Sequence, residues 1–259
     1  MKKTLIALTV AASAAVSGSA MAAWTQGAVK GGVDIGGSLT PEVKVIPWEA
    51  QIGATVDNLV GKIQTGSINA SIPVNTTIPV LGIRTVSYSG FVGEAGISPQ
   101  INYGDAVDFS ASVNGVAPVT LKMKNTADNS EIGKLTTSMD VVARVSRIKT
   151  DGTEGQSFNV FAAEVGQVFY GGVGASGISS GASLNDANTL IPGVTDKFVD
   201  FGGKDVGQWR TFIEPSFKYS AVYASAIKAG NDIKLTLNAP ASTDEIKWTA
   251  QLPVTVFYQ

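Results

Sequence analysis

The 259-residue sequence contains neither cysteine nor histidine. Without cysteine the chain cannot form a disulfide, so its stability must come from a hydrophobic core or from partners. Histidine is the commonest general base and metal ligand, and its absence together with that of cysteine removes most nucleophilic triads and zinc sites. Carboxylate chemistry remains, yet charged residues make up only 15% of the chain. The composition therefore argues against an enzyme and predicts no metal and no cofactor.

The first 22 residues have the pattern of a secretory signal peptide. Lys2 and Lys3 precede an apolar stretch over 5–16, and Ala20-Met21-Ala22 matches an A-x-A cleavage site. The apolar stretch is shorter than the roughly 18 residues that a membrane-spanning helix needs, so the pattern predicts export. Cleavage after Ala22 leaves 17 Lys and Arg against 21 Asp and Glu, a net charge of −4. Such a chain offers no electrostatic surface for nucleic acid.

Runs of alternating apolar residues recur along the chain, as is typical of strands with one buried face. Three of them cover residues 68–74, 141–145 and 233–237, and turn-forming clusters stand at 127–130 and 150–152. Many short strands without βαβ alternation predict an all-β sandwich.

One segment favours a helix instead. Val56, Leu59, Val60 and Ile63 stand at i, i+3, i+4 and i+7, which is the spacing of one helical face. Gly61 weakens this prediction, because glycine destabilises a helix by about 1 kcal/mol relative to alanine.

Residues 29–39, VKGGVDIGGSL, form a strand pattern near the start of the predicted mature chain. The segment carries four glycines, and no tight turn and partner strand follow it. A patterned strand without a partner of its own is predicted to pair with another molecule. Its alternate positions are occupied by Val29, Gly31, Val33, Ile35, Gly37 and Leu39.

The C-terminal run alternates in the same way, with Trp248, Ala250, Leu252, Val254, Val256 and Tyr258 at every second position. Pro253 has no N–H group, so the strand is predicted to lie at an edge or to be interrupted there. An apolar terminal strand with a free flank invites aggregation unless it is covered. Two interpretations stay open: the two ends of the chain pair within one molecule, or they are complementary between molecules.

Both ends resemble FaeG-type fimbrial subunits, which are assembled by the chaperone–usher route. Residues 32–40 (GVDIGGSLT) are similar to the N-terminal extension of that family, and residues 247–259 (KWTAQLPVTVFYQ) to its C-terminal strand. The interior stretches that match are ISPQI at 97–101, LKMKN at 121–125, VFYGG at 168–172 and residues 220–227.

The resemblance implies an incomplete immunoglobulin-like sandwich that is completed by a donor strand from a neighbouring subunit. The donor positions would be those of residues 29–39 given above, and the acceptor groove would lie beside Trp248, Leu252, Val254, Val256 and Tyr258. A periplasmic chaperone would fill this groove before an outer-membrane usher assembles the fibre. The implied partners are identical or related fimbrial subunits.

The resemblance also implies a domain division and a function. The chain divides into a signal peptide (1–22), a donor-strand extension (23–40) and a pilin domain (41–259), with a divergent, loop-rich insertion around 171–208 that has room for short helices. The implied function is that of a structural fimbrial subunit at the cell surface, which supports adhesion to host cells. The absence of cysteine agrees with the family, which generally lacks a disulfide.

The alternative function is that of an adhesin that binds a host glycan through residues 171–210. Aromatic rings next to polar groups suit the faces of sugars, and here they are Phe201, Lys204, Asp205, Trp209 and Arg210. The opposing interpretation, which we favour, makes Trp209 and Phe212 core residues at the start of the next strand. The pairs Asp196–Lys197 and Lys204–Asp205 are predicted to be solvated turn charges.

A glycine motif in the same region is weak support for a nucleotide site. Gly172, Gly174 and Gly177 spell G-x-G-x-x-G, a motif that needs a helix opening at the glycines. Residues 178–187 lack a helical apolar stripe, so the sequence predicts a loop here and no nucleotide.

Overall fold

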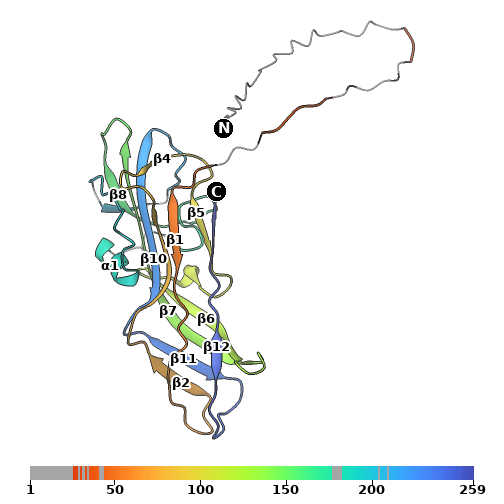
Figure 1. Ribbon diagram of the computed structural model, residues 1–259, viewed down its shortest axis with the longest axis vertical. Coiled ribbons are helices and arrows are strands. Elements are labelled where there is room, and N and C mark those ends of the chain that lie inside the picture. Colours follow the sequence, from red (N-terminus) through yellow and green to blue (C-terminus); the bar gives the residue numbers. More distant parts are fainter. Residues whose placement is uncertain are drawn as a thin grey trace, which may run out of the picture. The chain divides into compact units, whose positions relative to one another are not determined.

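The computed structural model describes residues 26–28, 30, 33, 35–40, 44–176, 183–203, 205–208 and 210–259, and for 205–208 the backbone alone. The chain divides into two units, one ending at Lys44 and the other spanning Val45–Gln259 (Figure 1). The second unit holds all the regular secondary structure described below.

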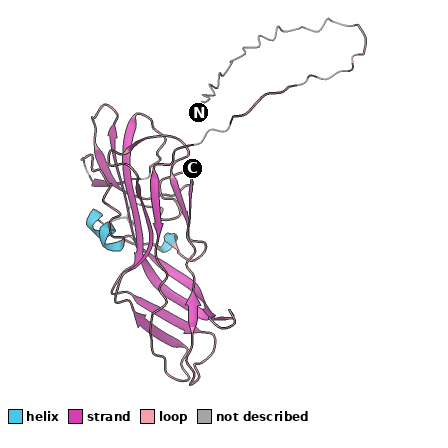
Figure 2. Ribbon diagram, viewed as in Figure 1, coloured by secondary structure: helices cyan, strands magenta, loops and turns pink. Residues whose placement is uncertain are grey.

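Strands dominate the second unit, and helices are short (Figure 2). In chain order the elements are β1 (Trp48–Ile52), β2 (Asn69–Pro73), β3 (Ile78–Thr85), β4 (Phe91–Val92), β5 (Pro99–Asn102), the 3-10 turn η1 (Phe109–Ala111), β6 (Val116–Asn125), β7 (Glu131–Lys149), β8 (Gln156–Val160), α1 (Leu184–Leu190), β9 (Asp205–Gln208), β10 (Phe217–Ile227), β11 (Asp232–Leu237), β12 (Trp248–Ala250) and β13 (Thr255–Tyr258).

The large sheet is organised by β7, a strand of 19 residues. Its first half pairs with β6 and β11, and its second half pairs with β10 and β8. The main strand order is β1-β3-β10-β7-β11-β2, with β12 beside β6, β4 beside β10 and β9 beside β8. The pair β8–β9 is parallel and the other pairs are antiparallel. Strand β7 thus links the part of the sheet that holds β1, β3 and β10 to the part that holds β11 and β2.

A second sheet, made of β5 and β13, packs against β10. The hydroxyl of Tyr103, which follows β5, lies 2.9 Å from the hydroxyl of Tyr223 and 2.8 Å from that of Ser225, both on β10. The indole N–H of Trp48 donates to the carbonyl of Ile97 at 2.6 Å, which ties β1 to the segment before β5. The aromatic side chains that fill the core here are Trp48, Phe91, Phe169, Phe212 and Tyr219.

Strand β10 is buried on both faces, which sets the place of α1. One face packs in the core with Tyr223, and the other is covered by α1 and the turn after it. The residues of this second cluster are Val142, Ala187, Leu190, Ile191, Val194, Val222, Ala224 and Ala226. Ser183 caps α1 and forms a capping box with Asp186. No helix in the described part of the chain is long and apolar enough to cross a membrane.

The structure confirms the all-β sandwich and the three alternating runs, which fall in β2, β7 and β11. The helix predicted over 56–63 is wrong, because these residues adopt no regular secondary structure. Gly61 explains the difference in part: a methyl group on its Cα would stand 2.7 Å from Cγ1 of Ile72. Gly61 thus lies close to Ile72 of β2, and a helix, which carries side chains all round, has no room there.

The C-terminal run is interrupted, as the lack of an N–H on Pro253 predicts. Strand β12 ends at Ala250 and β13 begins at Thr255. The two pieces pair with different partners, β12 with β6 and β13 with β5. The run therefore borders both sheets.

Candidate functional site: an apolar groove beside the C-terminal strands

A groove of about 1340 Å³ opens beside the C-terminal strands. One wall is formed by residues 52–60, which are the last residue of β1 and the segment after it, and the other by residues 245–252 with Val254. Between the walls lie apolar side chains that also belong to the core: Val80, Leu121, Leu135, Ile227 and Ile233. The groove thus leads from solvent down to the hydrophobic core.

Both walls present backbone groups that have no partner within the described part of the chain. Residues 54–63 make no backbone–backbone hydrogen bond there, and Gly53, which donates to the carbonyl of Val80, is the last residue tied to β3. Residues 251–254 likewise make none. Because β12 and β13 each pair with one strand, the second edge of each is free. Free edges on either side of an apolar floor are the features that accept an added strand.

Three of the five residues predicted for the acceptor groove line it, namely Trp248, Leu252 and Val254. Val256 and Tyr258 do not line this cavity; they are half-buried and pack against the core from β13. Burial raises the pKa of the Tyr258 hydroxyl above its usual value. All five residues thus pack against the core, and three of them also line the groove.

Sequence reasoning missed the opposite wall, residues 52–60, because it assigned part of this segment to a helix. A period-two signal was present, since Leu59, Gly61 and Ile63 alternate, and Leu59 and Ile63 pack against the core. For the floor residues no signal existed. Leu121, Leu135 and Ile233 each stand in an alternating strand pattern that is typical of core-facing residues, and nothing in these patterns indicates a groove above them.

The predicted donor residues fall in the first unit. Val29 and Gly31 lie outside the described residues. The side chains of Val33, Ile35 and Leu39 are 87%, 94% and 100% exposed, and Gly37 has no atom within 4 Å of the place where a Cβ would stand. These three apolar side chains are thus available to a partner.

Of the residues predicted to contact a glycan, the structure describes the side chains of two. The backbone N–H of Phe201 donates to Oγ of Ser146 at 2.8 Å, and the guanidinium carbon of Arg210 lies 4.9 Å from the ring centre of Phe158. Both are tied to β7 and β8. Lys204, Trp209 and the side chain of Asp205 lie outside the described residues, so a glycan site here stays a prediction.

Phe212 is fully buried, as predicted for a core residue, although β10 begins five residues later. The glycine motif has no helix at its start: α1 begins at Leu184, Gly172 and Gly174 precede it in a turn region, and Gly177 lies outside the described residues. The geometry that a dinucleotide requires is not present in the described part of this region.

One charge prediction is wrong. Lys197 is not a solvated turn residue, because its side chain is 15% exposed and its ammonium donates to Glu49 at 2.5 Å. Arg84 binds the other oxygen of Glu49 at 2.8 Å and donates to the carbonyl of Gly193 at 2.6 Å. The bonds from Lys197 first, and from Arg84 second, hold the pKa of Glu49 below its usual value. This ion cluster fastens the turn after α1 to β1 and β3.

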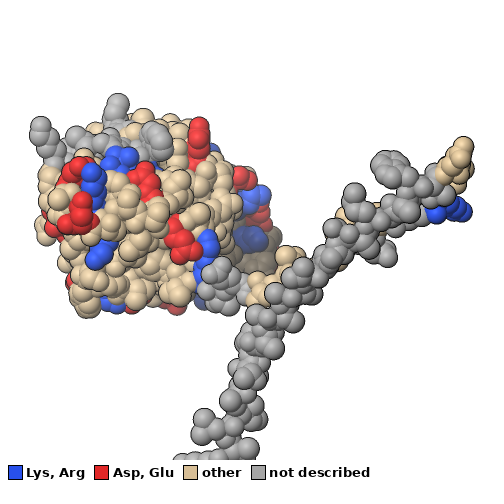
Figure 3. All heavy atoms as spheres, turned by 90° about the horizontal axis from the view of Figure 1, so that it is seen from above, with Lys and Arg blue, Asp and Glu red and all other residues tan. Residues whose placement is uncertain are grey.

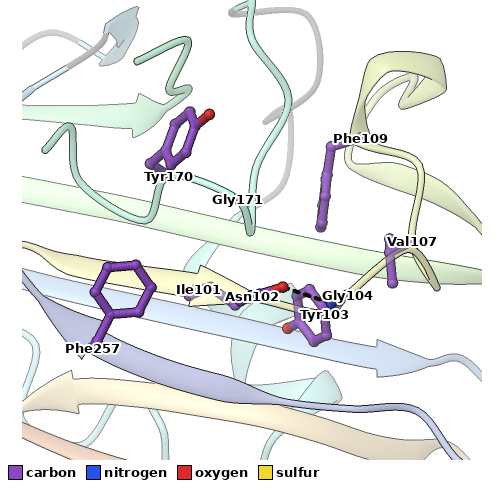
Figure 4. A pocket seen from close by; sticks show the side chains of 9 residues that line it. All are labelled: Ile101, Asn102, Tyr103, Gly104, Val107, Phe109, Tyr170, Gly171 and Phe257. Atoms are coloured by element: carbon purple, nitrogen blue, oxygen red, sulfur yellow. Dashed lines mark hydrogen bonds between the residues drawn. The ribbon is translucent and has the colours of Figure 1, made fainter. Parts of the chain in front are cut away.

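A second cavity, of about 330 Å³, opens beside β5 and β13 (Figure 4). The rings of Phe109, Tyr170 and Phe257 surround it, and its lining carries no charged side chain. The side chain of Phe257 is 43% exposed, whereas its neighbours Val256 and Tyr258 pack on the core. This second cavity and the groove share no lining residue in the described part of the chain.

The described residues offer no cluster of three or more carboxylate side chains that could hold a metal ion. Figure 3 shows acidic and basic side chains mixed over one end of the molecule, without a field of one sign. Ion pairs such as Lys149–Glu154 and Arg147–Glu214 join opposite charges on the described surface. The groove floor thus offers apolar contact and its walls offer backbone pairing. Its lining also includes charged residues of both signs, namely Asp57, Asp105, Lys122, Lys124, Lys134, Glu245 and Lys247.

The described residues thus define an all-β sandwich with a groove open along its C-terminal strands. A family model described as "Fimbrial, major and minor subunit" matches residues 1–259, and the chain belongs to this family. It is 30% identical over 280 residues to the F41 fimbrial protein of Escherichia coli, and 30% identical over 291 residues to the K88 fimbrial protein AB of the same species. Each comparison covers 100% of both chains. The protein is therefore a fimbrial subunit, displayed at the cell surface in a fimbria.

Proposed function

We propose that the chain is a structural subunit that polymerises by donor-strand exchange, with residues 29–39 of one copy occupying the groove of the next. The observation that carries this proposal is the groove itself. Residues 54–63 and 251–254 present unpaired backbone groups across an apolar floor. A strand laid between them would pair with both walls and cover the floor.

The donor segment shares its alternating pattern with the C-terminal run that borders the groove. Residues 29–39 and the run 248–258 each span eleven residues, and the part of that run which lines the groove is 248–252 with Val254. In the donor the exposed apolar side chains alternate, so all would point to the floor when its backbone pairs with the walls. Burying an aliphatic side chain of this kind contributes roughly 1.5–3 kcal/mol, so Val29, Val33, Ile35 and Leu39 together offer about 6–12 kcal/mol before ordering costs.

The rest of the proposal follows from exposure of the groove before assembly. A periplasmic chaperone would cover it after removal of residues 1–22, and an outer-membrane usher would exchange the chaperone for residues 23–40 of the next subunit. Residues 41–259 would then form the folded pilin domain. The protein acts through assembly and not as an enzyme, and the fibre supports adhesion of the bacterium to host cells.

The test uses two rearrangements of the chain. A copy of residues 29–39 fused behind Gln259 should fill the groove of its own subunit and give a stable monomer that does not polymerise. Deleting 29–39 from the N-terminus should abolish polymers while the chaperone still binds, because the groove is intact. Electron microscopy and size-exclusion chromatography measure both outcomes. Normal fibres from the deletion variant would refute the proposal.

A matched pair of substitutions separates the donor pattern from donor length. Ile35→Asp puts a charge on the side that faces the floor and should block polymerisation. Ser38→Asp puts the same charge on the other side of the strand and should leave polymerisation intact. Equal effects from the two variants would contradict an alternating, groove-bound donor.

A further inference from the structure

Val45, the first residue of the second unit, lies just before β1. The residues around the start of β1 form one end of this unit. The N–H of Val86 donates to the carbonyl of Pro47 at 2.9 Å, so the loop after β3 lies against the start of β1. The segment before β5 joins both, because Trp48 bonds to Ile97 while Ser98 pairs with Gln259 through two backbone hydrogen bonds of 2.9 and 3.1 Å. We call this the exit end: it holds the start of β1, the loop 86–90 and the C-terminus.

The exit end carries three exposed apolar side chains near the start of β1. Val45 is 84% exposed, Val86 42% and Tyr88 71%. The ring of Tyr88 is held in place by Lys197, whose ammonium lies 5.7 Å from the ring centre and is itself bonded to Glu49. Single exposed apolar residues are ordinary, but a group around one point indicates a contact surface. These three residues are called the exit patch.

The opposite end of the C-terminal run is formed by other loops. The N–H of Thr126 donates to the carbonyl of Lys247, which places the turn 126–130 beside the start of β12. The loop 238–247 lies there too, with Ala241 hydrogen-bonded to Gly66 and Ser67. This is called the β12 end.

The connection between donor and sandwich is short. Five residues, 40–44, separate Leu39 from Val45. Six peptide steps span at most about 20 Å when fully extended. A neighbour whose groove holds Leu39 must therefore lie close to Val45, and the exit patch lies at that junction.

The direction of the donor decides which part of the neighbour meets the patch. If Leu39 lay beside Tyr258 of the neighbour, two exit ends would face each other. Each exit end would then contact two neighbours, namely the copy that receives its donor strand and the copy whose donor strand it receives. Both neighbours would have to lie within the short span of residues 40–44. If Leu39 lies beside Trp248, each exit end meets one β12 end, and the contact repeats without closing, as a fibre requires.

We propose that the exit patch is a second contact between successive subunits, in which Val45, Val86 and Tyr88 of one copy pack against the β12 end of the next. The partner is another copy of this chain or a related fimbrial subunit. This inference rests on donor-strand exchange and adds a surface to it. The donor strand holds the copies together, while the patch fixes the angle between them and stiffens the junction.

The absence of cysteine gives a direct test. In fibres of the full chain carrying Tyr88→Cys and Thr243→Cys, mild oxidation should join successive subunits and give a ladder of covalent oligomers on a non-reducing denaturing gel. Thr243 is an exposed residue of the loop at the β12 end. The control pair, Tyr88→Cys with Asn185→Cys, should give no ladder, because Asn185 is an exposed residue of α1, the helix that packs on β10 and β7.

A second measurement covers the case in which cysteine geometry prevents a bond. Fibres of a Val86→Ser, Tyr88→Ser variant should form but bend and dissociate more readily than the parent fibres, while the self-complemented monomer keeps its unfolding midpoint. Polymers that show neither a ladder nor altered stiffness would overturn the exit-patch contact alone. A failure of the unsubstituted chain to polymerise would overturn donor-strand exchange, and this contact with it.

Discussion

The hydroxyl groups of Tyr103 and Tyr223 lie 2.9 Å apart in the core and join the β5 side of the sandwich to β10. Tyr223 also donates to the carbonyl of Gly172 at 3.0 Å, and Ser225 lies 2.8 Å from the Tyr103 hydroxyl. Both rings are almost completely buried. Polar atoms at this depth stabilise the fold only while every partner is present.

Removing one hydroxyl from this network is expected to cost stability. Tyr223→Phe leaves the Gly172 carbonyl without its donor and deprives Tyr103 of one partner, so the free energy of unfolding should fall by about 1–3 kcal/mol. Urea unfolding of the self-complemented subunit measures it. Tyr88→Phe removes a hydroxyl from an exposed ring and serves as the control. Equal stability of the two variants would contradict a structural role for the network.

The same network predicts sensitivity to alkali. Burial raises the pKa of Tyr103 to about 12 and that of Tyr223 well above its usual value. An unfolded tyrosine ionises near about pH 10, so the stabilisation is complete below that pH and is lost as the pH rises from about 10 towards 12. The free energy of unfolding should fall over this range. The fall should be smaller in a Tyr103→Phe, Tyr223→Phe variant, and an unchanged slope would contradict the assignment.

The cluster around Glu49 predicts an acid-sensitive attachment of the turn after α1. The pKa of Glu49 is lowered by its bonds to Lys197 and Arg84, so its contribution is present above the unfolded value of 4.5 and is lost as the pH falls below it. Glu49→Gln should reduce stability at neutral pH, and its difference from the parent should shrink in acid. Glu164→Gln, at an exposed loop position, is the matched control. A difference between Glu49→Gln and the parent that stays constant with pH would contradict this account.

Gly53 ends the pairing between β1 and β3 and admits no side chain. A methyl group on its Cα would stand 1.9 Å from the carbonyl oxygen of Pro79. Gly53→Ala should therefore destabilise the sandwich by about 1–3 kcal/mol, the range of overpacked sites. Gly36→Ala, where nothing lies within 4 Å, is the control for the same substitution. Thermal unfolding compares them, and a neutral Gly53→Ala would show that the two strands can separate at no cost.

The pattern of alternating residues predicted much of the fold, because a half-buried strand has apolar side chains at every second position of its sequence. Residues 68–74, 141–145 and 233–237 lie in β2, β7 and β11 as expected. Residues 56–63 failed because two periods coincide there: their apolar residues fit one helical face, while Leu59, Gly61 and Ile63 also alternate. The close approach of Gly61 to Ile72 favours the extended form, and this approach is set by the folding of the segment onto β2.

The candidate site was predictable on one side only. The alternation over residues 248–258 predicts an apolar strand with a free flank, and Trp248, Leu252 and Val254 do line the groove. The other wall of the groove and its floor come from segments whose sequence patterns are typical of ordinary strands or of a helix. Lys197 was misjudged for the same reason, since Glu49 and Arg84 reach it from β1 and β3.

The sequence by itself determined the β architecture, the absence of disulfide and histidine chemistry, and the matching alternation of residues 29–39 and 248–258. These are properties of composition and of neighbours along the chain. The tertiary structure decided where backbone pairing stops within the described residues: segments 54–60 and 251–254, which make no backbone hydrogen bond there, border one groove above Leu121 and Leu135. No local pattern in the sequence encodes such a groove, because it is defined by the spacing of two distant segments and only folding sets that spacing.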